Sequence, residues 1–246
     1  MLSAVAATAD ALFERLVSTP GEAALFLDFD GVLAPIVARP EDARLPPDTR
    51  AELDRLAARY ALVSVISGRE SDDLRARVDV PGVVLVGSHG LELSPDAEDW
   101  RRRISDFAAN AAWPPEHTEL KGLTVAFHYR LEPDDDAAVS ALDEIAVTER
   151  RQGLNARFGR KVLEVLPPVG ANKGTAVRQL LEEARLTRAL VAGDDATDLD
   201  AFRAIDGLEC AVRVAVVSDE SPTALADWAE IVVTSTGEFL RLLRRL

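Results

Sequence analysis

The chain has 246 residues, of which 48% are apolar, enough for one large domain or two smaller ones with packed cores. Its formal net charge of −14 argues against nucleic acid and anionic membranes as main partners, and an anionic ligand would need local positive charge in its site. Cys210 is the only cysteine, which excludes an intrachain disulfide and favours a reducing, cytoplasmic setting.

The first third of the chain alternates between helical patterns and short, fully apolar runs. Residues 2–17 are typical of an amphipathic helix and lack the basic start of a signal peptide. We expect buried strands at 23–27, 61–66 and 83–86, and helices at 48–59 and 70–78. Four prolines between Pro35 and Pro47 predict a loop of limited freedom. No apolar run reaches about 18 residues, so we expect no membrane span.

The pattern changes in the middle of the chain. Residues 123–130 and 161–166 alternate apolar and polar side chains, which is typical of an antiparallel sheet with one solvated face. Within the first of these strands, Val125 and Phe127 are expected in the core. Acidic residues at 134–136 suit a helix N-terminus, and the helix is expected to reach about residue 151.

Fully apolar strands return in the last third of the chain. A helix is expected at 174–184, a buried strand at 189–192 and a further helix after residue 198. Strand-like runs at 210–217 and 230–233 and a C-terminal helix come after them. Strands of this kind alternating with helices indicate a parallel sheet that is covered on both faces. The sequence therefore predicts an α/β fold with a doubly wound core, residues 1–93 and 167–246, interrupted by an α/β insert at 94–166.

Polar clusters follow three of the buried strands. They are Asp28 with Asp30, Ser67, and Asp194 with Asp195. Ligands of open α/β sheets bind at the carboxyl ends of the strands, so these clusters can meet at one edge, and Lys173 can bring a positive charge there. Taken singly, each has an ordinary alternative: a polar turn, a turn serine or a solvated lysine at a helix start. Four such features in compatible places favour a site.

The residue types in these clusters suit phosphoryl transfer. An aspartate can attack a phosphoryl group, and a second carboxylate can protonate the leaving alcohol and then activate water. A phosphate dianion beside carboxylates is repelled by roughly 4 kcal/mol for each pair of unit charges about 4 Å apart at an effective dielectric near 20. One lysine cannot offset several such terms, whereas a divalent cation can, and all-oxygen ligands with phosphate favour Mg²⁺.

Other templates fit the sequence poorly. The chain has neither a G-x-G-x-x-G after a strand nor a G-x-x-x-x-G-K-[ST], so a nucleotide cradle is not expected. The histidines and Cys210 lack the spacing of a zinc site, and no G-x-S-x-G elbow is present.

Four motifs resemble those of the haloacid dehalogenase superfamily, in the same order. They are D-F-D-G-V-L at 28–33, S-G-R at 67–69, K-G at 173–174 and G-D-D-A-T-D at 193–198. Finer detail resembles the trehalose-6-phosphate phosphatase family, as in L-A-P-I at 33–36, G-S-H-G-L-E at 87–92, E-L-K-G-L-T-V-A-F-H-Y-R at 119–130 and K-V-L-E-V at 161–165. The resemblance implies a Rossmann-like core with an α/β cap. It also implies Mg²⁺-dependent hydrolysis of trehalose 6-phosphate through an aspartyl phosphate.

The resemblance assigns roles to individual residues. Asp28 would be the nucleophile, and Asp30 would be the general acid and base. Ser67 and Lys173 would hold the phosphoryl group, and Asp28, Asp194 and the backbone carbonyl of Asp30 would bind the metal. Supporting roles around the metal and phosphate would fall to Gly31, Asp195 and Asp198. The sugar would be bound by Arg69, His89, Gly90, Glu92, Lys121, His128, Arg130, Lys161 and Glu164.

Three positions depart from the family pattern and leave alternatives open. Val32 stands where the family usually has threonine, Leu199 replaces an acid, and Leu166 stands where an arginine commonly follows. The last two favour, as an alternative, another sugar or polyol phosphate, such as a sucrose phosphate or a glycosylglycerol phosphate. A phospho-acceptor receiver domain would leave the insert unexplained, and an inactive sugar-binding relative would not need the catalytic groups. We expect a monomer that acts on a small-molecule sugar phosphate.

Overall fold

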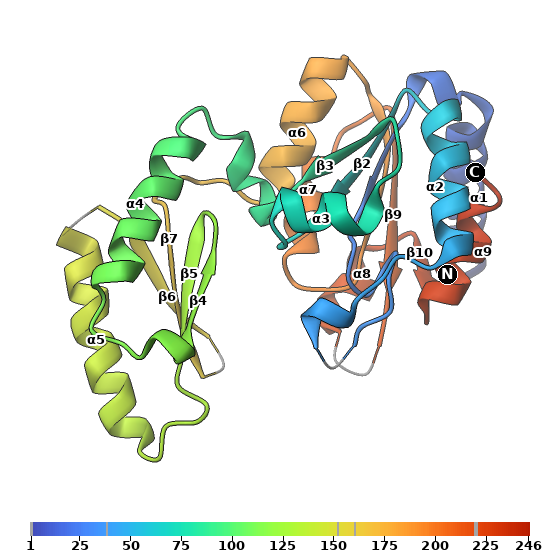
Figure 1. The fold of residues 1–246 in the computed structure, drawn as a ribbon. Coiled ribbons are helices and arrows are strands. Elements are labelled where there is room, and N and C mark those ends of the chain that lie inside the picture. The colour runs from blue at the N-terminus through green and yellow to red at the C-terminus, as the bar shows by residue number, and fades with distance from the viewer. Residues whose placement is uncertain (1, 38, 152, 160, 219–220) are drawn as a thin grey trace. The chain divides into compact units, whose positions relative to one another are not determined.

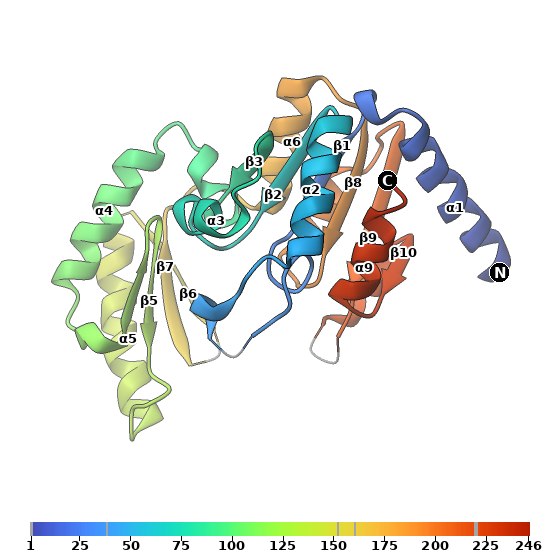
Figure 2. The ribbon, with the colours of Figure 1, turned by 45° about the vertical axis from the view of Figure 1, so that its right-hand side comes forward.

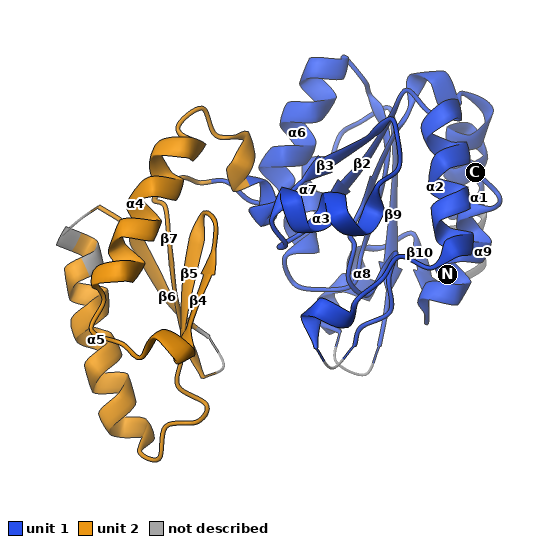
Figure 3. Cartoon of the chain, viewed as in Figure 1, with its two compact units in different colours: residues 1–90, 171–246 blue, residues 91–170 orange. Residues whose placement is uncertain are grey.

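The computed structural model describes residues 2–37, 39–151, 153–159, 161–218 and 221–246. The chain divides into two compact units, residues 1–90 with 171–246 and residues 91–170 (Figure 3). Each unit has its own sheet and its own hydrophobic core. The second unit is thus an insertion within the sequence of the first.

The first unit contains a six-stranded parallel sheet in the order β10-β9-β8-β1-β2-β3 (Figures 1 and 2). Its strands are β1 (Ala24–Leu27), β2 (Leu62–Ile66), β3 (Val83–Val86), β8 (Arg188–Gly193), β9 (Cys210–Val216) and β10 (Ile231–Val233). Leu27 pairs with Val65 of β2 and with Ala192 of β8, so the carboxyl ends of these three central strands are level.

Helices cover both faces of this sheet. They are α1 (Leu2–Ser18), α2 (Pro47–Arg59), α3 (Ser71–Val78), α6 (Lys173–Ala184), α7 (Asp198–Ala204), α8 (Thr223–Trp228) and α9 (Thr236–Leu243). Figures 1 and 2 show α1, α2 and α9 on one face and α6 and α7 on the other. Every residue of β1 is buried, because a parallel sheet between two helical layers leaves its central strands no solvated side.

The second unit is built on a four-stranded antiparallel sheet in the order β4-β5-β7-β6. Its elements are α4 (Ala97–Asn110), β4 (Thr118–Lys121), β5 (Thr124–His128), α5 (Asp135–Arg151), β6 (Asn155–Gly159) and β7 (Val162–Leu166). Val125 and Phe127 of β5 are fully buried among residues of α4 and α5, as predicted, and Phe127 meets the ring of Phe107 edge to face at 6.3 Å. The alternate residues of β5, which are Thr124, Ala126 and His128, lie on the opposite face of the sheet.

The predicted fold class, a parallel α/β core with an inserted α/β cap, is confirmed. The helices α4 and α8 and the strands β4 and β6 were not predicted from the sequence. The strands β4 and β6 are the two edges of their sheet, so their polar residues give little apolar alternation. In α4, Ile104 and Phe107 are the buried residues, a weak helical pattern.

Short 3₁₀ segments occur at Pro20–Glu22, Pro40–Asp42 and Pro115–His117, and Ser88–Leu93 is a kinked segment with non-helical backbone at His89 and Gly90. Within the described part of the chain, no helix has both the length and the apolar character that crossing a membrane requires.

Candidate active site

Asp28 follows the last residue of β1 and exposes 7% of its surface. Its N–H donates to the carbonyl of Ala192 at 3.1 Å, which ties it to the end of β8. At this junction the order of the strands reverses, since β2 and β3 lie on one side of β1 and β8 to β10 on the other. Open α/β sheets bind their ligands at such a point, so Asp28 lies where the topology favours a site.

Gly31 lets the chain turn sharply after Asp28. Its φ of +76° lies in the left-handed region that residues with a Cβ rarely adopt. A Cβ at this position would also overlap the carboxylate of Asp194. The N–H of Gly31 closes the turn by donating to the carbonyl of Ala34 at 2.8 Å. Both the backbone and the neighbouring carboxylate therefore require glycine here.

Lys173 brings a positive charge to Asp28. Its Nζ lies 2.8 Å from Oδ2 of Asp28 and 2.7 Å from Oδ1 of Asp198. Lys173 is the first residue of α6, and the Asn172 side chain caps this helix by accepting from the N–H of Thr175. Burial alone would lower the pKa of Lys173, but the two carboxylates raise it above its usual value. The ammonium therefore stays charged.

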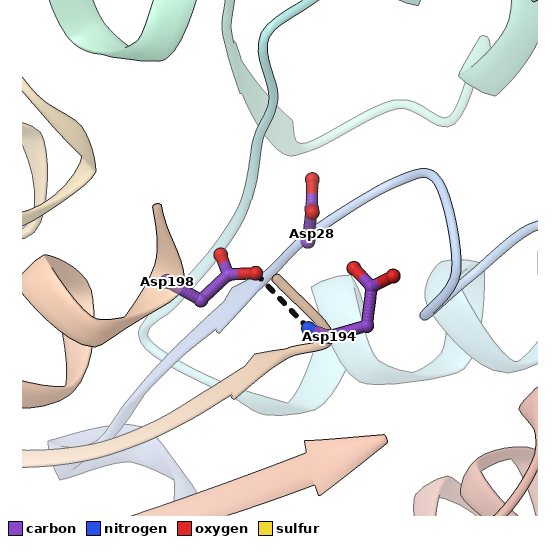
Figure 4. Close-up of side chains that lie close together, drawn as sticks. All are labelled: Asp28, Asp194 and Asp198. Carbon is purple, nitrogen blue, oxygen red and sulfur yellow. Dashed lines mark hydrogen bonds between the residues drawn. The ribbon is translucent and has the colours of Figure 1, made fainter. Parts of the chain in front are cut away.

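Asp198 is held through both of its carboxylate oxygens. Oδ1 accepts from Lys173, and Oδ2 accepts from the N–H groups of Asp194 and Asp195, each at 3.0 Å. Figure 4 shows the bond from Asp194. Because both oxygens have donors, Asp198 is suited to fixing Lys173 and the loop that follows β8. Asp195 itself is exposed.

Three carboxylates of this unit can hold a metal ion. One oxygen each from Asp28, Asp194 and Asp198 lie within 4.8 Å of one another (Figure 4). Burial and the nearby charges of Asp28 and Asp198 raise the pKa of Asp194 to about 8, and burial raises the pKa of Asp28 to about 7 against the pull of Lys173. A divalent cation would relieve this crowding of negative charge, and an all-oxygen donor set suits a hard cation. The residues therefore fit the predicted metal.

Ser67 follows β2, the strand next to β1, and exposes 2% of its surface. Its N–H donates to the carbonyl of Val86, and its carbonyl accepts from the N–H of His89, so the loops after β2 and β3 are joined. The imidazole of His89 also lies against Gly68, where a Cβ would lie 2.6 Å from Nε2. The structure thus brings Ser67 and His89 together at the edge of the sheet that carries Asp28.

Asp30 and Arg69 form a two-point ion pair. Nε of Arg69 lies 2.6 Å from Oδ2 of Asp30, and Nη2 lies 2.8 Å from Oδ1. The Asp30 carboxylate is therefore directed at Arg69 and is not one of the three clustered carboxylates described above. Arg69 was predicted to bind the sugar, and its ion pair with Asp30 was not predicted.

Two predicted sugar-binding residues of the second unit meet at Glu119. Nζ of Lys121 lies 3.1 Å from Oε2 of Glu119, and Nε2 of His128 lies 3.0 Å from the same oxygen. Glu119 was not among the predicted site residues. Its position two residues before Lys121 on one strand was the available signal, since residues i and i+2 share a face.

A second polar pair lies on the same face of this sheet. Glu164 is cross-strand from Ala126, which is cross-strand from Glu119. On its other side, Glu164 forms an ion pair with Arg157 of β6 at 2.6 Å. Glu164 was predicted as a site residue, and Arg157 was not, because β6 was not recognised as a strand.

The remaining predicted sugar-binding residues lie in several places. Lys161 forms an ion pair with Asp135 of α5. Arg130 is exposed, in the turn after β5. Gly90, with a φ of +95°, and Glu92 lie in the segment Ser88–Leu93. Sugar binding by these residues stays a prediction.

A family model and individual relatives both relate this chain to trehalose phosphatases. The model of the trehalose-phosphatase family matches residues 26–230. The chain is 36% identical over 209 residues to a trehalose-phosphate phosphatase of Mycobacterium avium, covering 75% of this chain and 51% of that protein. It is 34% identical over 229 residues to a trehalose-phosphate phosphatase of Mycobacterium tuberculosis, covering 82% and 56%. The chain thus spans about half the length of these two relatives.

The fold also resembles solved structures. A trehalose-6-phosphate phosphatase of Aspergillus fumigatus superposes with a TM-score of 0.68 at 24% identity, covering 95% of each chain. The parallel sheet with its aspartate cluster and inserted antiparallel unit defines a haloacid dehalogenase-like fold. Within that class, the chain belongs to the trehalose-phosphatase family.

Proposed function

We propose that this chain hydrolyses trehalose 6-phosphate to trehalose and phosphate, with Mg²⁺ as cofactor. The observation that carries the proposal is the clustering of the buried Asp28 and Lys173 with the half-buried Asp194 at the strand-order reversal of a chain in the trehalose-phosphatase family. This arrangement supplies a nucleophile, a fixed positive charge and metal ligands at one place. We assign catalysis to residues 1–93 and 167–246, and sugar recognition mainly to the cap, residues 94–166.

The proposed reaction has two steps. A carboxylate oxygen of Asp28 attacks phosphorus, the bond from phosphorus to the sugar oxygen breaks, and Asp30 gives that oxygen its proton. Asp30 then takes a proton from water, whose oxygen attacks phosphorus and breaks its bond to Asp28. Phosphate leaves, and both aspartates return to their starting states.

The buried ammonium of Lys173 favours the binding of a negatively charged phosphoryl group beside Asp28. If the Lys173 ammonium moved away, two buried carboxylates would be left without a partner, so its charge is fixed before the substrate arrives. Ser67 is expected to donate its hydroxyl proton to a phosphoryl oxygen. Mg²⁺, when bound by Asp28, Asp194 and the carbonyl of Asp30, would offset the repulsion between the carboxylates and the phosphate.

The sugar specificity is proposed to reside mainly in the polar face of the cap sheet. Lys121, His128 and Glu164 project from neighbouring strands on one face, and Glu119 joins them. Carboxylates, an amine and an imidazole can together donate to and accept from several sugar hydroxyls. The alternative substrates are other sugar or polyol phosphates. Localisation in the cytoplasm and a monomeric state stay predictions.

A panel of sugar phosphates, assayed by phosphate release with Mg²⁺ and with EDTA, tests the proposal. Trehalose 6-phosphate should have the highest kcat/KM, EDTA should stop turnover, and Asp28→Asn should abolish it. A higher kcat/KM for sucrose or glycosylglycerol phosphate would favour the alternative. Unchanged turnover by Asp28→Asn would refute the nucleophile.

A further inference from the structure

Arg69 commits most of its hydrogen-bonding capacity inside the protein. A guanidinium has five N–H groups. Two of them go to the carboxylate of Asp30, one goes to the carbonyl of Pro40 at 3.0 Å, and one goes to Asp73 at 2.9 Å. Its side chain is 13% exposed. Such a group has little capacity left for a sugar, and its main partner is the proposed general acid and base.

The guanidinium is itself anchored on several sides. It lies over the ring of Phe29, 5.5 Å from the ring centre. Asp73, in the first turn of α3, also accepts from Arg77 at 2.8 Å. Arg77 in turn donates to the carbonyl of Ala43. A helix, an aromatic ring and the loop after Pro40 thus hold Arg69 in one orientation. A bidentate pair with a fixed arginine leaves the carboxylate few alternative orientations.

We propose that Arg69 is a positioning residue that sets the orientation of the Asp30 carboxylate for its two proton transfers. The inference rests on the proposed phosphatase function and adds a role that the sugar-binding assignment does not contain. Without the two-point ion pair to Arg69, the Asp30 carboxylate can rotate into solvent, because the Asp30 side chain is 38% exposed. Proton transfer requires hydrogen-bond distance to the sugar oxygen, so a misplaced carboxylate slows the first step.

Two substrates with different leaving groups can distinguish a positioning role of Arg69 from other roles. We would measure the rate of the first turnover by rapid quench with trehalose 6-phosphate and with p-nitrophenyl phosphate. A sugar alcohol needs a proton to leave, whereas nitrophenolate does not. Arg69→Ala should therefore slow the first turnover on the sugar phosphate by about 10²-fold, and slow that on the nitrophenyl ester by less than about fivefold. Asp30→Asn should show the same selectivity, and adding Arg69→Ala to it should have little further effect.

Three further variants keep the test independent of folding. Arg69→Lys keeps the positive charge but lacks the planar fork for the two-point contact, so it should recover part of the rate. Asp73→Asn, which removes an anchor of Arg69, should show a weaker form of the same selectivity. Asp72→Asn is the matched control on the same helix, because Asp72 is 93% exposed and pairs with Arg75. It should behave as the wild type, and thermal melts should confirm that each variant is folded.

The outcomes distinguish the two proposals. Equal losses on both esters, an increase in KM alone, or an additive effect of Arg69→Ala in the Asp30→Asn background would overturn the positioning role while leaving the phosphatase proposal intact. A wild-type protein that releases phosphate from neither ester with Mg²⁺ would overturn both.

Discussion

Lys173 is one buried cation that contacts two buried carboxylates, with the Asp194 carboxylate close by. Removing one partner of a buried ion pair leaves an uncompensated charge, so these residues depend on one another. The motif residues were predictable, because each follows an apolar strand or begins a helix. The pairing of Asp30 with Arg69 was not, because it joins residues far apart in the sequence through side chains whose directions the pattern does not define.

Gly31 gives a prediction at the residue scale, with a control in the same chain. Gly31 and Gly207 both have positive φ, at +76° and +79°. A Cβ at Gly31 would overlap Asp194, whereas a Cβ at Gly207 would meet nothing within 4 Å. Gly207→Ala should therefore lower the free energy of unfolding by about 1–2 kcal/mol through backbone strain alone. Gly31→Ala should cost roughly 1–3 kcal/mol more.

Urea unfolding of the two variants measures the difference, and phosphate release measures its consequence. Gly31→Ala should also lose most activity, while Gly207→Ala should keep it. Equal stability losses with equal activities would show that the close approach of Gly31 to Asp194 is unimportant.

Among the elements, α6 links local sequence to the site most directly. Its cap is reciprocal, since Asn172 accepts from the N–H of Thr175 and the hydroxyl of Thr175 accepts from the N–H of Asn172. This fixes the first turn, and therefore the origin of the Lys173 side chain. The fully apolar strands and most helices were predictable from periodicity. The edge strands β4 and β6 were not, because edges carry polar residues, and Glu119 and Arg157 were missed with them.

Loss of the α6 cap should affect both stability and catalysis. Asn172→Ala should lower the free energy of unfolding by about 1 kcal/mol. It should also reduce kcat about tenfold, because the backbone position of Lys173 in the first turn of α6 is no longer fixed. Ser235→Ala removes the cap of α9, where Ser235 accepts from the N–H of Glu238, and should cost similar stability without loss of kcat. Unfolding curves and initial rates measure both effects. A similar kcat for the two variants would contradict the link between the cap and the site.

At the scale of the whole molecule, the negative charge of the chain and the negative charge of its site both favour the binding of a cation. The net charge is −14, and the three clustered carboxylates have one lysine between them. The metal-free protein therefore has unfavourable electrostatic energy among these carboxylates, which binding of a cation removes. Ligand binding to the folded state stabilises it by about 2.7 kcal/mol at a concentration of 100 Kd.

Asp194→Asn should separate these two contributions. Without metal, this variant should be more stable than the wild type, because asparagine avoids the free-energy cost of either charging or protonating a carboxyl group whose pKa is raised in the folded state. With Mg²⁺, the wild type should gain stability and the variant little. Asp200→Asn, whose side chain pairs with Arg203 and is 41% exposed, is the control and should respond to Mg²⁺ as the wild type does. Thermal melts with Mg²⁺ and with EDTA measure the response, and an equal gain in Asp194→Asn would exclude Asp194 as a ligand.

Trapping the covalent intermediate examines the transfer of phosphorus to Asp28 itself. The enzyme would be quenched during turnover of trehalose 6-phosphate, reduced with borohydride and digested, because borohydride converts an aspartyl phosphate to homoserine. Mass spectrometry should find homoserine at position 28 in the wild type and not in Asp28→Asn. Steady phosphate release with homoserine at another aspartate, or with none at all, would contradict the mechanism.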